Sequence, residues 1–341
     1  MKKENTKCRY NGLQPTDGSV AFAVAIIFSL ILSMAVAFIT DPNTQNIVYS
    51  IVLQIAFMSF TFFFAYRACK RDCPHLVKRV PDTLYSLGFN KRVKGSLIGI
   101  SVVLPIFCIL AFLPVSILVE KLFGLLGFHA QPSYADFTKS AELLIASIFA
   151  ICILPAFGEE MLLRGAVARS LRVKGTIFAI TFSALLFALM HGSPVQFIHQ
   201  FLIGLIMAYI VILTDCLWYS VIFHFVNNFS VILYEFIYVQ AGATYVIPKW
   251  AYAVMFVVGI IGVGLLLVLF TKCHIKNTEF VREQKRLVEQ KGKVKGTLEA
   301  LFNTSEYKYK AYDKTPYVAF YTALAIVVII WIMNTVVGWI G

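Results

Sequence analysis

Nine apolar segments limit what this sequence can fold into more than any other of its features. A helix needs about 20 apolar residues to cross a bilayer. Only 14% of the 341 residues are charged, against about 25% in soluble domains, and the mean hydropathy is +0.77. We therefore predict an all-α polytopic membrane protein with about eight to nine transmembrane helices. The expected spans lie at about 19–39, 47–66, 96–118, 141–163, 175–192, 195–213, 217–238, 250–271 and 316–340.

Positively charged residues gather in alternate connections between these spans. The net charge is +12, and the excess lies in the N-terminal segment, the 67–95 loop, the turn after the fourth span and the 271–315 segment. Because cytoplasmic loops carry such an excess, we expect an integral protein of the plasma membrane with a cytoplasmic N-terminus. No basic segment is interleaved with aromatic residues as in a nucleic-acid module, so nucleic acid is not an expected partner.

The seven cysteines are odd in number and scattered, which is not the pattern of a disulfide framework. The stretch "RACKRDCPH" brings together Cys69, Cys73 and His75, which could suggest a metal clip. Its spacing is not that of a zinc site, and no fourth ligand is evident. We interpret Cys69 and Cys73 as ordinary cytosolic thiols.

The stretch "AFGEEMLLRGAVARS", residues 156–170, places three charged residues at the end of an apolar run. Ionisable residues in membrane helices are costly and are functional candidates. Glu160 and Arg164 are four residues apart, so they share a helix face and can pair. Glu159 lies about 100° further round the helix and is left for another partner. The alternative is a solvated helix end at the membrane surface.

His191 is a possible partner for Glu159. The turn between the fourth and fifth spans centres near Gly175, and the two residues lie 16 positions before and after it. In a helical hairpin such residues lie at equal depth, roughly 24 Å from the turn at ~1.5 Å per residue. We therefore expect Glu159 and His191 to meet. The fourth helix must then continue beyond 163, with Arg169 and Arg172 projecting past the membrane core.

His224 and Asn228 are four residues apart and share a helix face. Together they can present two hydrogen-bond donors to a developing oxyanion. They could also complete a metal site, or simply join helices by hydrogen bonds. His199 has two similar options: a hydrogen bond to another span, or a place in the same cavity. With Glu159 and His191 included, we favour a functional site in a central polar cavity.

Three short motifs follow one another in this region. They are E-E-x-x-x-R in "EEMLLR", F-x-x-x-H from Phe187 to His191, and H-x-x-x-N from His224 to Asn228. Their order and membrane placement resemble the CPBP, or Abi, family of membrane-embedded endopeptidases, which includes type II CAAX prenyl proteases and bacteriocin-processing enzymes. The resemblance covers a catalytic core at 141–240. Residues 1–140 would supply N-terminal helices and a basic loop, and 241–341 C-terminal helices with the charged 272–315 segment.

The resemblance implies a role for each motif residue. Glu159 would be the catalytic base, His191 would hold the attacking water with it, and His224 and Asn228 would stabilise the oxyanion. Glu160 and Arg164 would be structural or would orient the substrate.

The need for a metal stays open at this point. Glu159, His191 and His224 are a legitimate zinc set with water as fourth ligand. The cofactor is therefore either none or zinc, and we favour water activated by a buried glutamate without a metal.

The leading hypothesis is an intramembrane endopeptidase that hydrolyses a membrane-associated protein or peptide, of the CAAX type or a bacteriocin-like precursor. Its expected partners are that substrate and the lipid bilayer. One alternative is a non-proteolytic immunity or regulatory protein on the same scaffold. Another is a transporter or channel with a Glu–His proton relay.

Overall fold

The computed structural model describes residues 13–72, 79–89, 93–128, 139–242, 247–275, 286, 289 and 318–340. Within these ranges every regular element is a helix, and no strand occurs. The chain is therefore an all-α, polytopic membrane protein, as predicted. The principal helices are α1 Pro15–Val36, α2 Pro42–Asp72, α3 Arg79–Ser86, α4 Gly95–Leu125, α8 Thr176–Met190, α9 Pro194–Thr214, α10 Trp218–Gln240, α11 Lys249–Ile275 and α14 Val318–Ile340.

One further helix runs without a break from Ala141 to Lys174 and is here called the 141–174 helix. Its turns change type along its length. The successive segments are α5 Ala141–Ser147, the π-helical η2 Ile148–Ile153, α6 Leu154–Glu160, the π-helical η3 Met161–Ala168, α7 Arg169–Leu171 and the 3₁₀ turn η4 Arg172–Lys174. The helix therefore continues past residue 163, as the pairing of Glu159 with His191 required.

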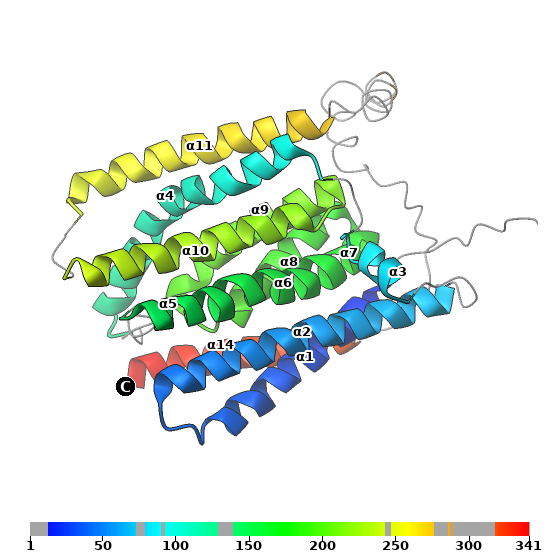
Figure 1. The fold of residues 1–341 in the computed structure, drawn as a ribbon, viewed down its shortest axis with the longest axis horizontal. Coiled ribbons are helices and arrows are strands. Elements are labelled where there is room, and N and C mark those ends of the chain that lie inside the picture. Colours follow the sequence, from blue (N-terminus) through cyan, green and yellow to red (C-terminus); the bar gives the residue numbers. More distant parts are fainter. Residues whose placement is uncertain are drawn as a thin grey trace, which may run out of the picture.

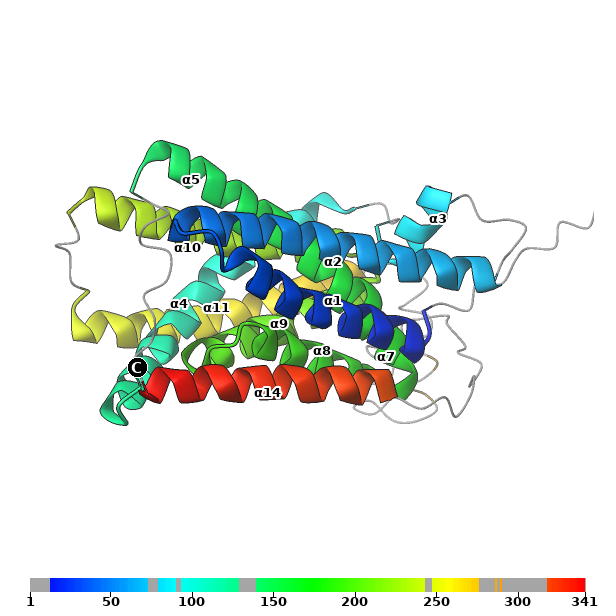
Figure 2. The same cartoon turned by 90° about the horizontal axis from the view of Figure 1, so that it is seen from below.

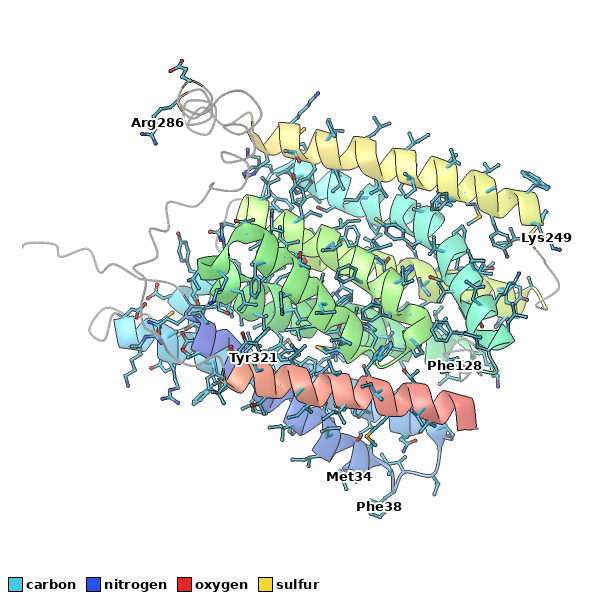
Figure 3. All side chains as sticks on the ribbon, turned by 180° about the vertical axis from the view of Figure 1, so that it is seen from behind. Met34, Phe38, Phe128, Lys249, Arg286 and Tyr321 are labelled. Carbon is cyan, nitrogen blue, oxygen red and sulfur yellow. The ribbon has the colours of Figure 1, made fainter. Side chains whose placement is uncertain are left out.

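Eight of the described helices are long and apolar enough to cross a membrane, and α8 is a shorter apolar helix of 15 residues. The predicted 67–95 loop is in part wrong, because α2 continues to Asp72 and α3 occupies Arg79–Ser86. Alanine, arginine and lysine near the end of α2 are good helix formers, so the helix extends beyond the apolar run. Large apolar side chains stay exposed on the outside, such as Met34 and Phe38 (Figure 3), as a lipid-facing surface requires.

The helices lie side by side with their axes roughly aligned (Figure 1). α11 packs along α4 at one edge, and α1 and α2 form the opposite edge. The 141–174 helix, α8, α9 and α10 lie between them. α14 packs against α1 and α8, on an outer face of the bundle that Figure 2 shows clearly. Residues from both ends of the chain thus cover the central helices.

Local signals explain where several helices begin and end. Asp41 accepts a hydrogen bond of 2.8 Å from the backbone of Thr44 and precedes Pro42, the first residue of α2. Ser193 and Pro194 begin α9 in the same way. The hairpin between the 141–174 helix and α8 turns at Gly175, whose φ of 110° lies in the left-handed region that glycine tolerates.

Ion pairs join several helices at one end of the bundle. Arg169 and Arg172 contact Asp215 at 2.5 and 3.3 Å, and Arg71 contacts Asp17 at 3.0 Å. Arg169 and Arg172, which were expected to project past the membrane core, are both buried against the loop between α9 and α10. A carboxylate from that loop offsets part of the positive charge of the turn. The sequence pattern missed it because Asp215 is over 40 residues away in the chain.

Candidate active site

A proline sets the local geometry of the helix that carries the two glutamates. Pro155 has no N–H, so it cannot donate a backbone hydrogen bond to the carbonyl of Ile151, as in an α-helix, or to that of Ala150, as in a π-helix. Ser50 of α2 donates to the Ala150 carbonyl at 2.6 Å, and Asn228 of α10 donates to the Ile151 carbonyl at 2.9 Å. Two neighbouring helices therefore satisfy the backbone groups that the proline leaves open. π-helical turns of this kind are frequent at functional sites.

Glu160 is fully buried and has three side-chain partners. Arg164, one turn along, approaches it at 2.6 Å, as the spacing predicted. Ser220 of α10 donates a hydrogen bond to its Oε2, and His224 Nδ1 lies 2.9 Å from its Oε1. A buried carboxylate is tolerated only when it is paired and hydrogen-bonded in this way. Glu160 therefore ties the 141–174 helix to α10.

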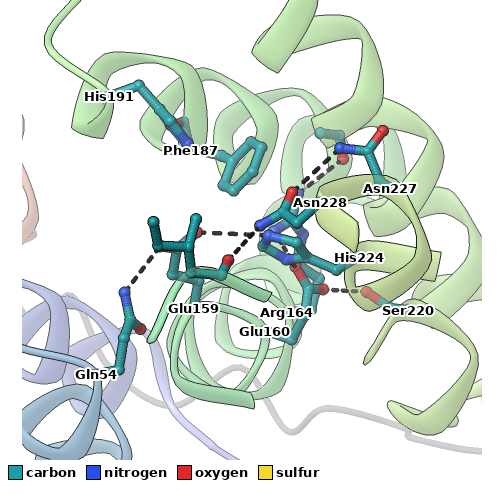
Figure 4. Close-up of polar contacts among 12 residues, drawn as sticks. Gln54, Glu159, Glu160, Arg164, Phe187, His191, Ser220, His224, Asn227 and Asn228 are labelled. Atoms are coloured by element: carbon teal, nitrogen blue, oxygen red, sulfur yellow. Dashed lines mark hydrogen bonds and ion pairs between the residues drawn. The ribbon is translucent and has the colours of Figure 1, made fainter. Parts of the chain in front are cut away.

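Glu159 has a more open environment than its neighbour. Its side chain is 13% exposed, whereas that of Glu160 is 0% exposed. Gln54 of α2 donates to Glu159 Oε1 at 2.9 Å (Figure 4). The other oxygen, Oε2, lies 3.9 Å from His224 Nε2, which is too long for a direct hydrogen bond and suits a bridging water. One oxygen of Glu159 is thus held, and the other faces the imidazole.

His224 lies between the two glutamates, with one ring nitrogen toward each. When Glu160 is charged, the Nδ1 beside it carries a proton, because a carboxylate can only accept. A neutral ring then presents an acceptor at Nε2, and a protonated ring presents a donor there. His224 therefore faces both carboxylates, one through each ring nitrogen.

His191 caps the C-terminal end of α8 on the other side of Glu159 (Figure 4). Its Nδ1 lies 2.7 Å from the carbonyl oxygen of Phe187, so this nitrogen is the donor and a neutral ring keeps Nε2 as an acceptor. Within the described residues, no hydrogen bond or ion pair joins His191 to Glu159. The hairpin thus brings His191 and Glu159 to the same space, as Figure 4 shows, without such a bond between them.

Phe187 contacts both histidines and the buried arginine. Its ring is edge-on to His191 and His224 at centroid distances of 4.7 and 5.7 Å. The Arg164 guanidinium lies over its face, 4.4 Å from the centroid. A cation over an aromatic face is favourable, most of all where water is excluded. Phe187 therefore holds the spacing between the two histidines while it covers Arg164.

The Asn228 amide faces the backbone, with consequences for its predicted role as an oxyanion donor. Its Nδ2 donates to the Ile151 carbonyl, and its Oδ1 accepts a hydrogen bond of 3.2 Å from Asn227. Asn228 therefore joins helices, which was one of the alternatives open from the sequence. The amide has a second N–H, which no described hydrogen bond uses.

Other candidate residues lie away from this cluster. His199 Nδ1 is 3.4 Å from the hydroxyl of Ser116 on α4, so it contacts another span. Cys73 and His75 lie outside the described residues, and so does most of the 272–315 segment. In the part of the chain that the structure describes, no three His, Cys, Asp or Glu side chains are arranged to hold a metal ion. The proposed zinc set of Glu159, His191 and His224 does not fit this geometry, and we derive no step through a metal.

Comparison with known families identifies the central segment. Residues 141–230 match the family described as type II CAAX prenyl endopeptidase Rce1-like. This segment is similar to that family. It contains the three motifs recognised in the sequence. No curated protein and no solved structure matches the chain.

The Rce1-like domain supports, in general terms, an intramembrane endopeptidase of the CAAX type. With its long apolar helices, the chain is an integral, multi-pass membrane protein. The domain lies within the catalytic core predicted at 141–240, whose boundaries stay a prediction. The roles of the individual catalytic residues and the central cavity also stay predictions.

Sequence reasoning missed two residues that contact the glutamates, Gln54 and Ser220. Gln54 had a detectable signal, since it is a polar residue in the middle of the apolar run "NIVYSIVLQIAFMSFTFFF". Ser220 lies one turn before His224 and therefore on its helix face. Phe187 was noted only as a motif position. Its contact with His191 is local to the end of α8, whereas its contact with His224 depends on tertiary packing.

Proposed function

We propose that this protein hydrolyses a peptide bond of a membrane-associated protein or peptide by means of a water molecule activated by Glu159. The observation that carries the proposal is the unequal environment of the two adjacent glutamates. Glu160 is buried and paired with Arg164, so it is neutralised. Glu159 keeps Oε2 without a direct hydrogen bond among the described residues, beside an imidazole 3.9 Å away. A base needs such an unpaired, accessible oxygen.

The reaction follows from these positions. Water held by Glu159 and His191 gives a proton to Glu159 Oε2 as its oxygen attacks the peptide carbonyl carbon. The carbonyl oxygen becomes an oxyanion, which accepts hydrogen bonds from His224 Nε2–H and from the second N–H of Asn228. Glu159 then passes its proton to the amide nitrogen as the C–N bond breaks. The products are a carboxylic acid, which keeps the second hydrogen of the water, and an amine, so the atoms of one water are accounted for.

The charges of the cluster favour this use of His224. Glu159 and Glu160 carry two negative charges, and Arg164 supplies one positive charge. A protonated His224 supplies a second positive charge, so the four charges cancel in an environment that disfavours net charge. It also turns Nε2 into the donor that an oxyanion needs. Glu160, which accepts from Nδ1 at 2.9 Å, supports this state of the ring.

The family match and the membrane placement support a substrate class. We propose a membrane-associated peptide or protein, with prenylated CAAX peptides as the first class to test. We further propose a plasma-membrane location with the N-terminus in the cytoplasm. Arg71 of α2 pairs with Asp17 of α1, and Arg169 and Arg172 of the 141–174 helix pair with Asp215, at one end of the bundle. This arrangement agrees with a single basic, cytoplasmic side.

The test is cleavage by the purified protein in liposomes. The probes are internally quenched peptides ending in a farnesylated CAAX sequence, together with the same peptides without the lipid. Wild-type protein should cleave at least one set, and Glu159→Gln should abolish cleavage while the protein stays folded. Cleavage by the Glu159→Gln variant at the wild-type rate would overturn the mechanism. Proton or ion flux through the wild type without any cleavage would favour the transporter alternative.

A further inference from the structure

We infer that Gln54 of α2 is a positioning residue for Glu159: its amide N–H holds one carboxylate oxygen so that the other is available as the base. This inference rests on the proposed function. Gln54 lies outside the Rce1-like segment of 141–230. A role for Gln54 would extend the functional unit of the protein to the N-terminal helices.

The contact between the two residues is short and buried. Gln54 is 3% exposed, and its Nε2 donates to Glu159 Oε1 at 2.9 Å. Arg164, the nearest cation on the same helix, is directed to Glu160. Among the described residues, Gln54 is the hydrogen-bond donor within reach of the Glu159 carboxylate, since His224 Nε2 is 3.9 Å away. Without it, Glu159 would have no partner fixing its orientation.

The orientation of the amide is determined by its surroundings. A carboxylate only accepts, so the nitrogen of Gln54 must face Glu159. Its oxygen is then buried without a hydrogen-bond partner among the described residues, and it lies against the backbone of Gly158. A methyl group on residue 158 would overlap that oxygen and would lie 2.9 Å from the backbone oxygen of Gln54. Gly158 therefore allows α2 to approach close enough for the amide to reach the neighbouring glutamate.

A second contact fixes the register of α2 on the 141–174 helix. Ser50 is four residues before Gln54 and therefore on the same face of α2. Its hydroxyl donates to the Ala150 carbonyl at 2.6 Å, in the π-helical segment before Pro155. Two side chains one turn apart thus bind the same helix. The packing of α2 against that helix therefore places the Gln54 amide beside Glu159.

The chemistry favours an amide at this position over a cation. A lysine or arginine would add a further positive charge on the Oε1 side of Glu159, beyond that of His224, and would weaken it as a base. A neutral N–H supplies a hydrogen bond to the charged oxygen without a full opposite charge. The arrangement also separates the two oxygens of Glu159, with Oε1 toward α2 and Oε2 toward His224. Only Oε2 is then placed to take a proton from water.

The test compares wild type with Gln54→Met, which keeps the length of the side chain and removes the donor. With the peptide probe that the wild type cleaves, kcat should fall by about 10- to 100-fold, as expected for loss of a hydrogen bond to a charged group. KM should stay within about twofold, because Gln54 does not touch the substrate in this proposal. Gly158→Ala should produce a similar loss by displacing the amide. Gly99→Ala is the matched control, since this helical glycine of α4 has open space around it.

A second readout needs no substrate. Infrared difference spectroscopy on protein in liposomes should reveal a carboxyl band that disappears in Glu159→Gln. That band should shift in Gln54→Met and Gly158→Ala and stay in place in Gly99→Ala. An unshifted band together with wild-type kcat in Gln54→Met would overturn the inference even if Glu159→Gln is inactive. Cleavage that survives Glu159→Gln would instead overturn the proposed function, and the two failures are therefore distinguishable.

Discussion

Asn228 of α10 supplies the hydrogen bond that Pro155 cannot give to the carbonyl of Ile151. The donor and the carbonyl oxygen are 2.9 Å apart and come from segments 77 residues apart in the chain. The proline explains why the helix before the two glutamates takes π-helical turns, and the asparagine explains how its open backbone group is satisfied. Asn228 therefore has a structural role whether or not it also contacts an oxyanion.

The two roles of Asn228 can be separated by restoring the missing N–H. Asn228→Ala should lower the free energy of unfolding by about 1–3 kcal/mol, because the Ile151 carbonyl loses its partner. Adding Pro155→Ala gives residue 155 an N–H that can reach this carbonyl in an α-helix, so the double variant should recover part of that loss. Denaturant unfolding in detergent micelles measures both effects.

Cleavage by the same variants distinguishes the oxyanion role. If Asn228 also stabilises the transition state, the double variant should regain stability and keep a kcat about 100-fold below that of Pro155→Ala alone. Pro155→Ala alone is the control for any change in helix geometry. Full recovery of kcat together with stability would show that Asn228 only joins the helices.

The two glutamates should respond differently to the same chemical change. Glu160→Gln leaves the fully buried Arg164 without a countercharge, so it should destabilise the protein by roughly 3–5 kcal/mol. Glu159→Gln removes no ion pair with Arg164 and should change stability by less than about 1 kcal/mol while cleavage is lost. Thermal unfolding and peptide cleavage, measured on both variants, give the comparison. Equal destabilisation by the two changes would contradict the asymmetry.

Asp215 should act on stability and not on chemistry. It contacts Arg169 and Arg172, and its φ of 53° lies in the left-handed region, which asparagine tolerates. Asp215→Asn therefore removes the charge without straining the backbone, and we expect a loss of about 1–3 kcal/mol in unfolding free energy.

The exposed helix cap Asp41 offers a matched control for this change. Asp41→Asn should be nearly neutral, since asparagine caps helices as well as aspartate does. The kcat of folded Asp215→Asn protein should equal that of the wild type. A large fall in kcat without a loss of stability would show that Asp215 contributes to the reaction.

Chelation should leave cleavage intact. Within the described residues, no three His, Cys, Asp or Glu side chains converge as a metal site requires, and Glu159 and His224 interact with each other across 3.9 Å. We expect the rate to stay within about twofold of the untreated value after dialysis against a strong zinc chelator. Elemental analysis of the purified protein provides the matching measurement. Loss of activity that zinc alone restores would reverse this prediction.

The sequence was sufficient for features that depend on neighbouring residues. The apolar runs predicted the helices, because a bilayer tolerates only segments that satisfy their own backbone groups. The spacing of Glu160 and Arg164 predicted their ion pair, because residues four apart share a helix face. The position of Gly175 predicted the turn of the hairpin. The three motifs were also enough to recognise the family that matches residues 141–230.

The tertiary structure decided which side chains from other helices contact each glutamate. Equal depth along a hairpin suggested His191 as the partner of Glu159, but depth leaves the rotation of each helix undetermined. The packing of α2 makes Gln54, 105 residues away in the chain, the hydrogen-bond partner of Glu159. The packing of α10 sets His224 between the two carboxylates. Such contacts depend on the register of helices that are distant in sequence, and no local periodicity contains that information.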